Sequence, residues 1–336
     1  MLGNERMAME RLKEELISLT HRAGAQKTGF AAAHPVREES VDRFNSWLSE
    51  GKHGGMAYMK NYPDIRQNPR LLLNGINPEE PCTLMVCAFS YYHTERQTPD
   101  AARIAMYAHG SDYHEVLRQR LQPVLAHLDS LGIKGRICID SAPLRERYWA
   151  VEAGIGFIGR NGQLIVDGVG SYVFLATVIF NAHVSPDEPC RRSCLGCRRC
   201  LTACPGQAIG ADGDIDARRC VSYLTIEHRG DLPDTLAMPD GTSRPIAGIL
   251  GNRVYGCDEC QRVCPHNRRP LPTGIAEFHL RPSLRTLSHA DILNMTQPTF
   301  STLFRHSPVK RTRLAGLIRN ARPTPTALDP IIVVVR

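Results

Sequence analysis

Apolar residues recur at helical spacing in three stretches of the chain. Residues 1–24 predict an amphipathic helix that ends at Gly24, with these positions on its apolar face: Met9, Leu12, Leu16 and Leu19. A second helix is predicted over His114–Leu131, where Pro123 is expected to kink the helix and Gly132 to end it. Glu146–Ala153 indicates a third, shorter helix.

Short apolar runs between these helices predict strands. Thr83–Tyr91 indicates a buried strand, and Arg136–Asp140 indicates a shorter one that ends at Asp140. Gln163–Val166 and Ser171–Phe180 suggest a hairpin around residues 167–170. Because helices and strands alternate in this way, we expect a domain of α/β or α+β class over the first ~185 residues.

Breaks in the pattern divide the chain into three predicted domains, which span residues 1–185, 186–275 and 276–336. Residues 182–189 are polar, contain proline and show no periodicity, so they mark the first boundary. The last domain is expected to consist of short helices. Ser307 and Pro308 supply a cap and a first-turn proline for one that continues to about Asn320. The tail from Pro323 is broken by prolines and predicts no element.

Eight of the twelve cysteines follow the ligand spacing of two [4Fe–4S] clusters. The first run is C-x2-C-x2-C-x3-C-P, the spacing of bacterial ferredoxins, with these cysteines: Cys194, Cys197, Cys200 and Cys204. The second run holds only three, Cys257, Cys260 and Cys264, because Val254 stands at the expected first position. Cys220, which lies upstream, can supply the missing thiolate.

In two-cluster ferredoxins the fourth cysteine of each run binds the other cluster. One cluster is therefore expected on Cys194, Cys197, Cys200 and Cys264, and the other on Cys204, Cys220, Cys257 and Cys260. Zinc is the alternative for soft thiolates, but zinc ribbons use two separated C-x2-C pairs. Disulfides would require an oxidising compartment. Two clusters predict a chain that transfers electrons.

Composition narrows the compartment and the partners. The chain has 336 residues, is 42% hydrophobic and has no apolar run near the roughly 18 residues that cross a bilayer. Residues 1–24 resemble neither a signal peptide nor a twin-arginine leader, so we expect a cytoplasmic protein without a membrane partner. The net charge of +7 is compatible with a polyanion such as RNA and also with an ordinary basic surface. Arginines and lysines gather at 191–199, 218–219 and 310–313.

Two other motifs are weaker. Residues 154–159 match GxGxxG, but a predicted helix precedes them and a strand follows, which reverses the order of a dinucleotide-binding unit. Asp112-Tyr113-His114 begins like the D-x-H-x-x-G signature of His-ligated cobalamin, yet Leu117 stands where glycine is required. His114 could equally be an ordinary residue of a helix N-terminus. Four thiols remain. Cys82, Cys87 and Cys138 are predicted to be buried. Cys190 is not predicted to be a cluster ligand, because it breaks the spacing of the first run.

Asp140 is the best candidate for a catalytic acid. It ends a predicted strand and opens the turn DSAP (140–143), which would present its carboxylate at a cleft. A helix cap or a turn aspartate is the alternative. In a dry pocket beside a cofactor the pKa of Asp140 would rise, and the acid could then deliver a proton near neutral pH.

Six ordered stretches resemble the epoxyqueuosine reductase family over roughly residues 50–270. They are GMAYMKNYPDIRQNPRLLL (55–73), YAHGSDYHEVLRQRL (107–121), DSAPLRERYWAVEAGIGFIGRN (140–161), CLGCRRCLTACPGQAI (194–209), DARRCVSYLTIEHRG (216–230) and GNRVYGCDECQRVCPHN (251–267). The last three are specific in combination, because a lone cysteine before SYLTIE and a shortened second run are typical of this family.

The resemblance implies a cobalamin-dependent reductase related to reductive dehalogenases. It would convert epoxyqueuosine to queuosine at the wobble position of tRNA with a GUN anticodon (Asp, Asn, His and Tyr), the final step of queuosine biosynthesis. A nitroreductase-like domain would hold base-off cobalamin. A ferredoxin-like domain with two [4Fe-4S] clusters would pass electrons to it from an unidentified donor. The protein is expected to be a monomer.

The resemblance also implies roles for single residues. Asp140 corresponds to the family's proton donor. The surroundings of cobalamin correspond to these residues: Arg66, Tyr107, Asp140, Arg147, Gly159, Arg160 and Asn161. Arg160 stands where the family pattern favours lysine, which keeps the charge but changes its geometry. Residues 307–321 resemble the start of a HEAT-like repeat that PTPTALDP then ends, so we expect a truncated helical region with less basic surface for tRNA.

Three other functions compete with this interpretation. A reductive dehalogenase would normally carry a twin-arginine leader. A plain electron carrier would explain the cysteines but leave the first ~185 residues without a role. A tRNA-binding module without catalysis would need neither the acid nor eight cluster ligands.

Overall fold

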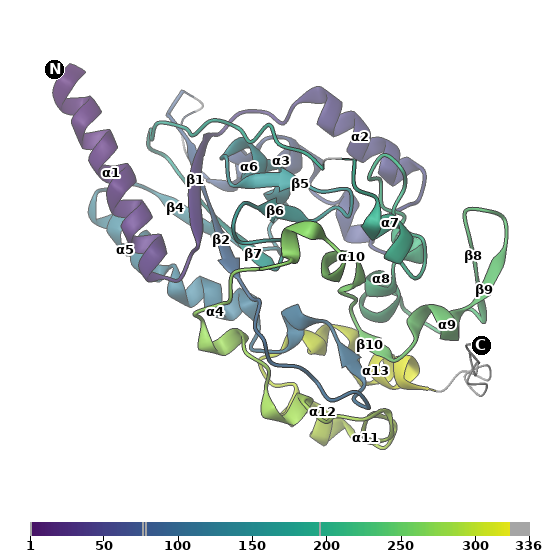
Figure 1. The fold of residues 1–336 in the computed structure, drawn as a ribbon. Coiled ribbons are helices and arrows are strands. Elements are labelled where there is room, and N and C mark those ends of the chain that lie inside the picture. The colour runs from purple at the N-terminus through teal and green to yellow at the C-terminus, as the bar shows by residue number, and fades with distance from the viewer. Residues whose placement is uncertain (1, 76, 78, 195, 323–336) are drawn as a thin grey trace.

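The computed structural model describes residues 2–75, 77, 79–194 and 196–322. Its centre is a four-stranded antiparallel sheet in the order β1-β2-β7-β4 (Figure 1). The strands are β1 Lys27–Ala32, β2 Thr83–Ser90, β4 Gly135–Cys138 and β7 Val173–Phe180. All pairs are antiparallel, so the first part of the chain is of α+β class.

Both faces of this sheet are covered, which explains why β2 is an unbroken apolar run. Met85, Cys87 and Phe89 pack into the core on one face, and the residues between them pack into a second core on the other. Helices α1 Leu2–Arg22 and α5 Gln122–Ser130 cover the first face, and α6 Glu146–Glu152 covers the second through buried Trp149 (Figure 1). The other helices of this region are α2 Glu38–Ser49, α3 Pro63–Gln67 and α4 Tyr113–Arg120.

Two of the predicted elements are corrected by the structure. The helix expected over 114–131 is two helices, α4 and α5, because Pro123 lies in the first turn of α5 and the chain breaks at Leu121. The expected hairpin of 163–166 with 171–180 is limited to one antiparallel bridge, between Val166 and Gly170. Strand β6 Leu164–Val166 instead pairs with β5 Gly156–Ile158, while β7 pairs with β2 and β4. The other predicted elements match α1, β2, β4 and α6.

The cysteine-rich region is built from short elements. They are α7 Arg199–Ala203, α8 Val221–Ile226, β8 Thr235–Ala237, β9 Ser243–Pro245, α9 Ile246–Leu250, β10 Arg253–Tyr255 and α10 Glu259–Arg262. Strand β10 pairs in parallel with β3 Arg103–Ile104, so an early segment of the chain lies within this later region (Figure 1). The cores therefore cross the predicted domain boundaries, which stay a prediction.

The C-terminal part forms small helices, α11 His289–Leu293, α12 Gln297–Leu303 and α13 Arg313–Ala321. The side chain of Ser307 caps a 3-10 turn, Pro308–Thr312, as predicted, but Arg313 has φ +61° and separates this turn from α13. The apolar side chains of α11, α12 and α13 pack against Ala102, Ile104 and Tyr255. The tail from residue 323 lies outside the described residues. Among the described helices, none has the length and apolarity that a bilayer crossing requires.

Candidate active site

Asp140 lies in the loop that follows β4, in a strained conformation. Its φ of +50° is in the left-handed region, which a non-glycine residue adopts only when its surroundings impose it. The Glu146 carboxylate accepts a hydrogen bond from the Asp140 backbone N–H at 2.8 Å and fixes the loop from α6. The Asp140 side chain is 47% exposed, although protein groups approach it from several elements.

Two residues at the start of α4 contact the Asp140 carboxylate. The Tyr113 hydroxyl donates to Oδ2 at 2.9 Å, and Nε2 of His114 lies 3.4 Å from the same oxygen. The rings of Tyr113 and His114 are stacked with centroids 4.1 Å apart, and Phe174 stacks on the other side of Tyr113 at 4.3 Å. Asp112 caps α4 and also holds Nδ1 of His114 at 2.8 Å.

Hydrogen bonds and nearby charges set the protonation states in this cluster. Burial favours the neutral acid of Asp140, but hydrogen bonds from His114 and Tyr113, with the charges of His114 and Arg311, hold its pKa below the usual range. In the protein alone the carboxylate has hydrogen-bond donors and solvent around it, and the rise expected in a dry pocket beside a cofactor stays a prediction. Burial alone would lower the pKa of His114, yet hydrogen bonds to Asp112 and Asp140 raise it to about 9. His114 thus carries the proton at neutral pH.

Glu146 is the second proton-holding group. Burial, followed by the charge of Asp140, raises the pKa of Glu146 to about 8. Asp140 is consequently an ionised carboxylate that lies between a protonated imidazole and a neutral carboxylic acid.

The C-terminal region supplies a positively charged side chain, Arg311, to the site. Nη1 of Arg311 lies 3.8 Å from Oδ2 of Asp140, while Nε of Arg311 pairs with Glu227 at 2.7 Å. The Arg311 guanidinium also lies over the Tyr58 ring, 5.7 Å from its centroid. Arg66, a predicted cofactor residue, donates to the backbone oxygens of Asn61 and Tyr58 on the same segment. Two tyrosines of this segment present large surfaces: Tyr58 is 41% exposed and Tyr62 is 61% exposed.

Tyr107 connects this site with the cysteine region. Its ring lies 6.4 Å from that of Tyr113 and 6.0 Å from that of Tyr255. On the other side it reaches Gly256, where an added Cβ would lie 3.5 Å from Tyr107 and 2.6 Å from Ala105. Gly256 also has φ +72° and directly precedes Cys257, so only glycine fits this approach.

The described thiols interact in two separate sets, and the assignment of one cluster to each set stays a prediction. Burial and neighbouring thiolates raise the pKa of Cys264, whose neighbours are Cys194 and Cys197, and of Cys200, whose neighbours are Cys194 and Cys264. Backbone N–H groups face these sulfurs: that of Arg160 lies 3.5 Å from Sγ of Cys194.

The second set is more deeply buried. Burial raises the pKa of Cys260 strongly, and Cys220, Cys257 and Cys204 add to the effect. Burial raises the pKa of Cys257 to about 12, with a contribution from Cys220. The Ala208 N–H donates to Sγ of Cys204 at 3.3 Å. Four soft donors in each set, some with N–H groups aimed at sulfur, fit [4Fe–4S] clusters, which need the thiolate form that the buried apoprotein disfavours.

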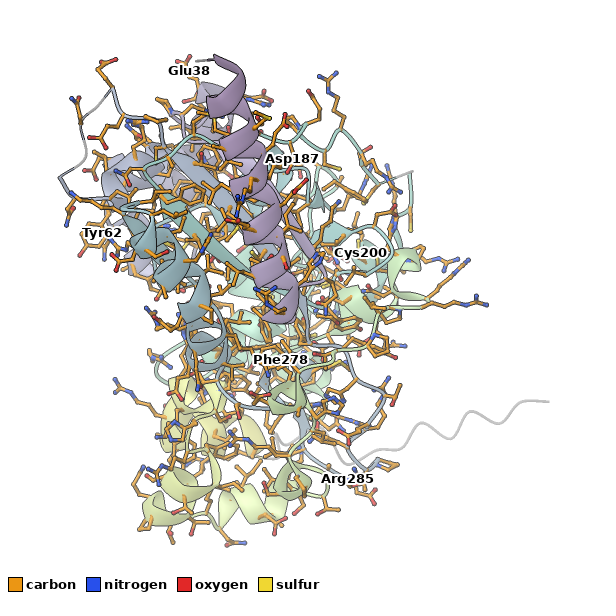
Figure 2. The ribbon with its side chains drawn as sticks, turned by 90° about the vertical axis from the view of Figure 1, so that its left-hand side faces the viewer. Glu38, Tyr62, Asp187, Cys200, Phe278 and Arg285 are labelled. Carbon is orange, nitrogen blue, oxygen red and sulfur yellow. The ribbon has the colours of Figure 1, made fainter. Side chains whose placement is uncertain are left out.

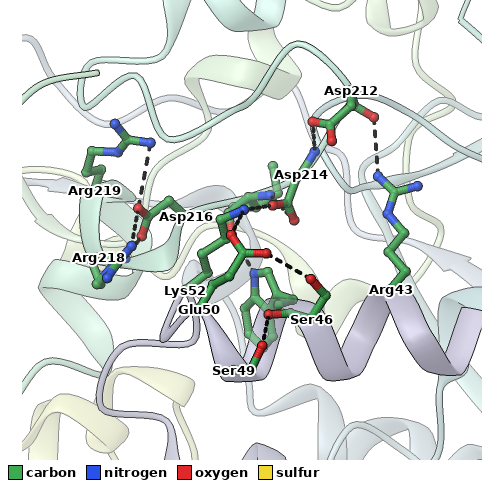
Figure 3. A network of polar contacts seen from close by, with 12 residues as sticks. Arg43, Ser46, Ser49, Glu50, Lys52, Asp212, Asp214, Asp216, Arg218 and Arg219 are labelled. Carbon is green, nitrogen blue, oxygen red and sulfur yellow. Dashed lines mark hydrogen bonds and ion pairs between the residues drawn. The ribbon is translucent and has the colours of Figure 1, made fainter. Parts of the chain in front are cut away.

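A polar network holds the segment that precedes the lone Cys220 in the chain (Figure 3). Lys52 follows α2 and pairs with Glu50 at 2.6 Å and with Asp214. The Lys52 carbonyl accepts from the Ala217 N–H at 2.8 Å, and Trp47 Nε1 donates to the Ile215 carbonyl at 2.6 Å. Asp216 binds Arg218 and caps the short turn before Cys220. Residues 212–219 are thereby held against α2.

The remaining predicted cofactor residues lie elsewhere. Besides the backbone contact with Cys194, Arg160 donates from its guanidinium to the Ala211 carbonyl, and Asn161 donates to the Cys260 carbonyl at 3.4 Å. Gly159 packs against Asn161 and Ile165. This segment thus lies against both cysteine sets, and within the described residues no hydrogen bond or ion pair joins it to Asp140. Arg147 is exposed beside Glu146.

Sequence reasoning missed several residues of the site. Tyr58, Tyr113, Glu146 and Arg311 were not predicted to lie there, and His114 was left between two interpretations. The stretches 55–73, 107–121 and 140–161 contain four of these five and carry the family resemblance, so they held the available signal. For Arg311 the sequence offered only a local excess of basic residues, which did not indicate the acid site.

Comparison with known families covers both regions. A family model described as "Epoxyqueuosine reductase QueG, DUF1730" matches residues 66–141, which include Tyr113, His114 and Asp140. A model described as "4Fe-4S double cluster binding domain" matches residues 193–267, which include all eight predicted cluster cysteines.

Similar proteins extend over most of the chain. The epoxyqueuosine reductase of Leadbetterella byssophila is 35% identical over 314 residues, which cover 93% of this chain and 98% of that protein. That of Cyclobacterium marinum is 37% identical over 310 residues, or 88% of this chain and 93% of that protein.

Solved structures are similar over the same length. A crystal structure of epoxyqueuosine reductase with a tRNA-TYR epoxyqueuosine-modified stem loop has a TM-score of 0.82 and 30% identity, covering 93% of this chain and 80% of that one. The Bacillus subtilis epoxyqueuosine reductase, in a structure whose aspartate-bearing catalytic loop is swung out of the active site, has a TM-score of 0.81, 30% identity and the same coverage.

Proposed function

The chain belongs to the epoxyqueuosine reductase family of oxidoreductases, and we propose that it removes the epoxide oxygen of epoxyqueuosine at the wobble position of tRNA to give queuosine. The observation that carries this proposal is the connection of an acid site with two sets of four thiols. Asp140, Tyr113, Tyr107 and Gly256 form a continuous series of neighbours that ends at Cys257.

In the proposed arrangement each thiol set holds one [4Fe–4S] cluster. Cys194, Cys197, Cys200 and Cys264 hold the first, and Cys204, Cys220, Cys257 and Cys260 hold the second. Support comes from the pairing of thiols within each set and from the double-cluster family match. Because Gly256 and Tyr107 lie beside Cys257, the second cluster would face the Asp140 site and pass electrons to it.

Cobalamin is the cofactor proposed for the space between the second thiol set and Asp140. The residues present suit a large, flat, partly polar group, because Tyr58 and Tyr62 are exposed and Arg66 and Arg311 supply cations beside them. When bound, cobalamin supplies cobalt-centred reduction at low potential. Arg66, Tyr107 and Arg147 are proposed to hold it within a nitroreductase-like domain. Gly159, Arg160 and Asn161, which contact the cysteine loops, are proposed to reach it from the cluster side.

The chemistry requires protons as well as electrons. Opening the epoxide and forming the alkene takes two electrons and two protons and releases the oxygen as water. An epoxide oxygen leaves poorly unless it is protonated, so a positioned acid is needed. We assign that position to Asp140. Because His114 holds a proton in contact with Oδ2 of Asp140, it can resupply the carboxylate after each transfer.

The tRNA substrate is inferred from the relative that was crystallised with a modified stem loop. For this chain the basic residues around the Asp140 site, including Arg311, offer phosphate contacts. The GUN anticodon specificity (Asp, Asn, His and Tyr) is carried over from the family as part of the proposal.

Anaerobic turnover tests the whole proposal. Clusters are reconstituted, cobalamin and dithionite are added, and digested epoxyqueuosine-containing tRNA is analysed by mass spectrometry. Loss of one oxygen from the modified nucleoside, only with cobalamin present, is the expected result. An unchanged nucleoside, with both clusters and cobalamin verified as bound, would contradict the proposed reaction.

A further inference from the structure

A basic hollow of about 700 Å³ lies on the outer side of the first thiol set. Its walls are α7 and the end of α10 with the loop that follows, and Cys264 forms part of the surface. The residues that line it are Arg198, Arg199, Thr202, Ala203, Arg262, Val263, Cys264, Pro265, Asn267 and Arg268. Figure 2 places Cys200 toward one side of the molecule, where nitrogen-tipped side chains project outward.

The charge of this hollow is unusually one-sided. Residues 190–207 and 261–270 contain seven arginines and neither aspartate nor glutamate. Arg192 and Arg262 have partners in Asp167 and Glu259. In the described part of the chain, no carboxylate lies within ion-pairing distance of Arg198, Arg199, Arg268 or Arg269, and all four are exposed.

Compensation for cluster charge does not explain these arginines well. The described hydrogen bonds to the cluster sulfurs come from backbone N–H groups, among them those of Arg160 and Ala208. Among the described residues, no guanidinium of the hollow donates a hydrogen bond to a cysteine sulfur. Guanidinium groups that do not contact the sulfurs and extend into solvent are suited to contact the surface of another molecule.

The position of the hollow relative to Asp140 is equally informative. The second thiol set borders Gly256 and Tyr107 and so faces the Asp140 site. The first set borders the hollow through Cys264. The two ends of the proposed electron path therefore open at different places: substrate reaches one end, and the other end is free for an electron donor.

We propose that this hollow is the docking site of an acidic, low-potential electron-carrier protein that reduces the first cluster. The inference rests on the proposed function, because it requires clusters on the thiol sets. Each turnover consumes two electrons, so two carrier molecules dock in succession and each loses one electron. For a flavodoxin-type carrier, each is oxidised from hydroquinone to semiquinone. Arginine tips around Cys264 attract the acidic rim of the carrier and bring its redox group close to the cluster.

tRNA is the competing partner for a basic surface. The hollow is less suited to it, because tRNA must place its wobble base at Asp140, at the other end of the path. Binding of tRNA is therefore measured as a separate outcome.

The test uses the reconstituted full chain and reduced flavodoxin as the acidic probe. Stopped-flow measurement without tRNA follows oxidation of the hydroquinone by the oxidised clusters. In the native sequence, raising NaCl from about 50 to 500 mM should slow the second-order rate at least 10-fold. Arg199→Glu with Arg268→Glu should slow it about 10- to 100-fold at low salt, and the glutamine pair should have a smaller effect. Arg285→Glu, an exposed control that Figure 2 places far from Cys200, should change it less than 2-fold.

Two further measurements separate the possible failures. Reduction by dithionite and the Kd for the tRNA stem loop should both stay within 2-fold in the charge-reversal variant. If both clusters are bound and the rate depends on neither salt nor these arginines, the docking site is refuted and the proposed function stands. A weakened Kd for tRNA with an unchanged carrier rate would assign the hollow to tRNA. Absence of clusters in the native protein would instead refute the proposed function. If the charge-reversal variant alone loses its clusters, the docking site is judged from the salt dependence of the rate in the native protein and from the rate of the glutamine pair.

Discussion

Gly206 should control one cluster and not the other. It follows Cys204 and Pro205, and its Cα faces the backbone of Arg219, the residue before Cys220. Two ligands of the second set therefore approach each other through this glycine. We predict that Gly206→Ala forces the two segments apart and releases the second cluster.

The size of the effect follows from the contact. A Cβ at residue 206 would lie 1.9 Å from the Arg219 carbonyl oxygen and 3.0 Å from its carbon. Backbone cannot rotate away as a side chain can, so one segment must retreat by about 1.5 Å to restore ordinary van der Waals contact at about 3.4 Å. Metal–ligand distances tolerate only about 0.2 Å, and overpacking of this kind costs about 1–3 kcal/mol. The chain can still fold, but the four ligands of the second set no longer converge.

Iron analysis and EPR of the reduced protein measure this outcome. We expect iron to fall from ~8 to ~4 atoms per chain, because each cubane holds four, and reduction of epoxyqueuosine-tRNA to disappear. Gly248→Ala is the matched control: this exposed glycine of α9 has open space where its Cβ would stand, so both clusters should remain. Full iron content and activity in Gly206→Ala would refute the close approach of Cys204 and Cys220 from which the prediction is made.

Three other predictions concern the acid site and the network at Cys220. Asp140→Asn keeps an acceptor for Tyr113 but cannot carry the proton, so we expect both clusters to remain and turnover to fall about 10²- to 10⁴-fold; activity within tenfold of the native value would exclude Asp140 as the proton donor. The pKa of His114 is raised from 6.5 to about 9, so its contribution to stability is complete below pH 6.5 and is lost as the pH rises through 9. Urea unfolding should show this loss in the native chain and not in His114→Gln. If the free energy of unfolding of the two proteins changes in parallel with pH, the assignment is contradicted. Lys52→Met leaves Asp214 and Glu50 without their cation at a partly buried site and should lower the free energy of unfolding by about 1–3 kcal/mol, with faster loss of the second cluster in air. Exposed Lys310→Met is its control, and equal stability of the two variants would show that the network does not hold residues 212–219.

The sequence predicted those elements that depend on neighbouring residues. Strand β2 was predictable because its run of apolar residues is continuous, and α1 because its apolar face repeats at helical spacing. The hairpin around 167–170 formed only as a single bridge, because strands can pair with partners that are distant in the chain. Strand β6 pairs with β5, and β7 pairs with β2 and β4, which no local pattern specifies.

The acid site shows the same division. Asp140 could be selected because it ends a strand and opens a turn, and the resemblance to the family supports it. Its charge state could not be predicted, since it depends on Tyr113 and His114 from α4 and on Arg311 from the C-terminal region. Those donors lower a pKa that burial alone would have raised.

By itself the sequence determined the type of chemistry, because the spacing of cysteines, prolines and the lone Cys220 is a covalent property of the chain. It also determined the family, which many short matches in order establish. Only the tertiary structure decided which groups meet. It brought Cys220 to Cys260, placed Tyr107 between Asp140 and the thiols, and left four arginines near Cys264 without carboxylate partners in the described residues: Arg198, Arg199, Arg268 and Arg269. Burial and electrostatic interaction depend on distances in space, and folding sets those distances among residues that are far apart in the chain.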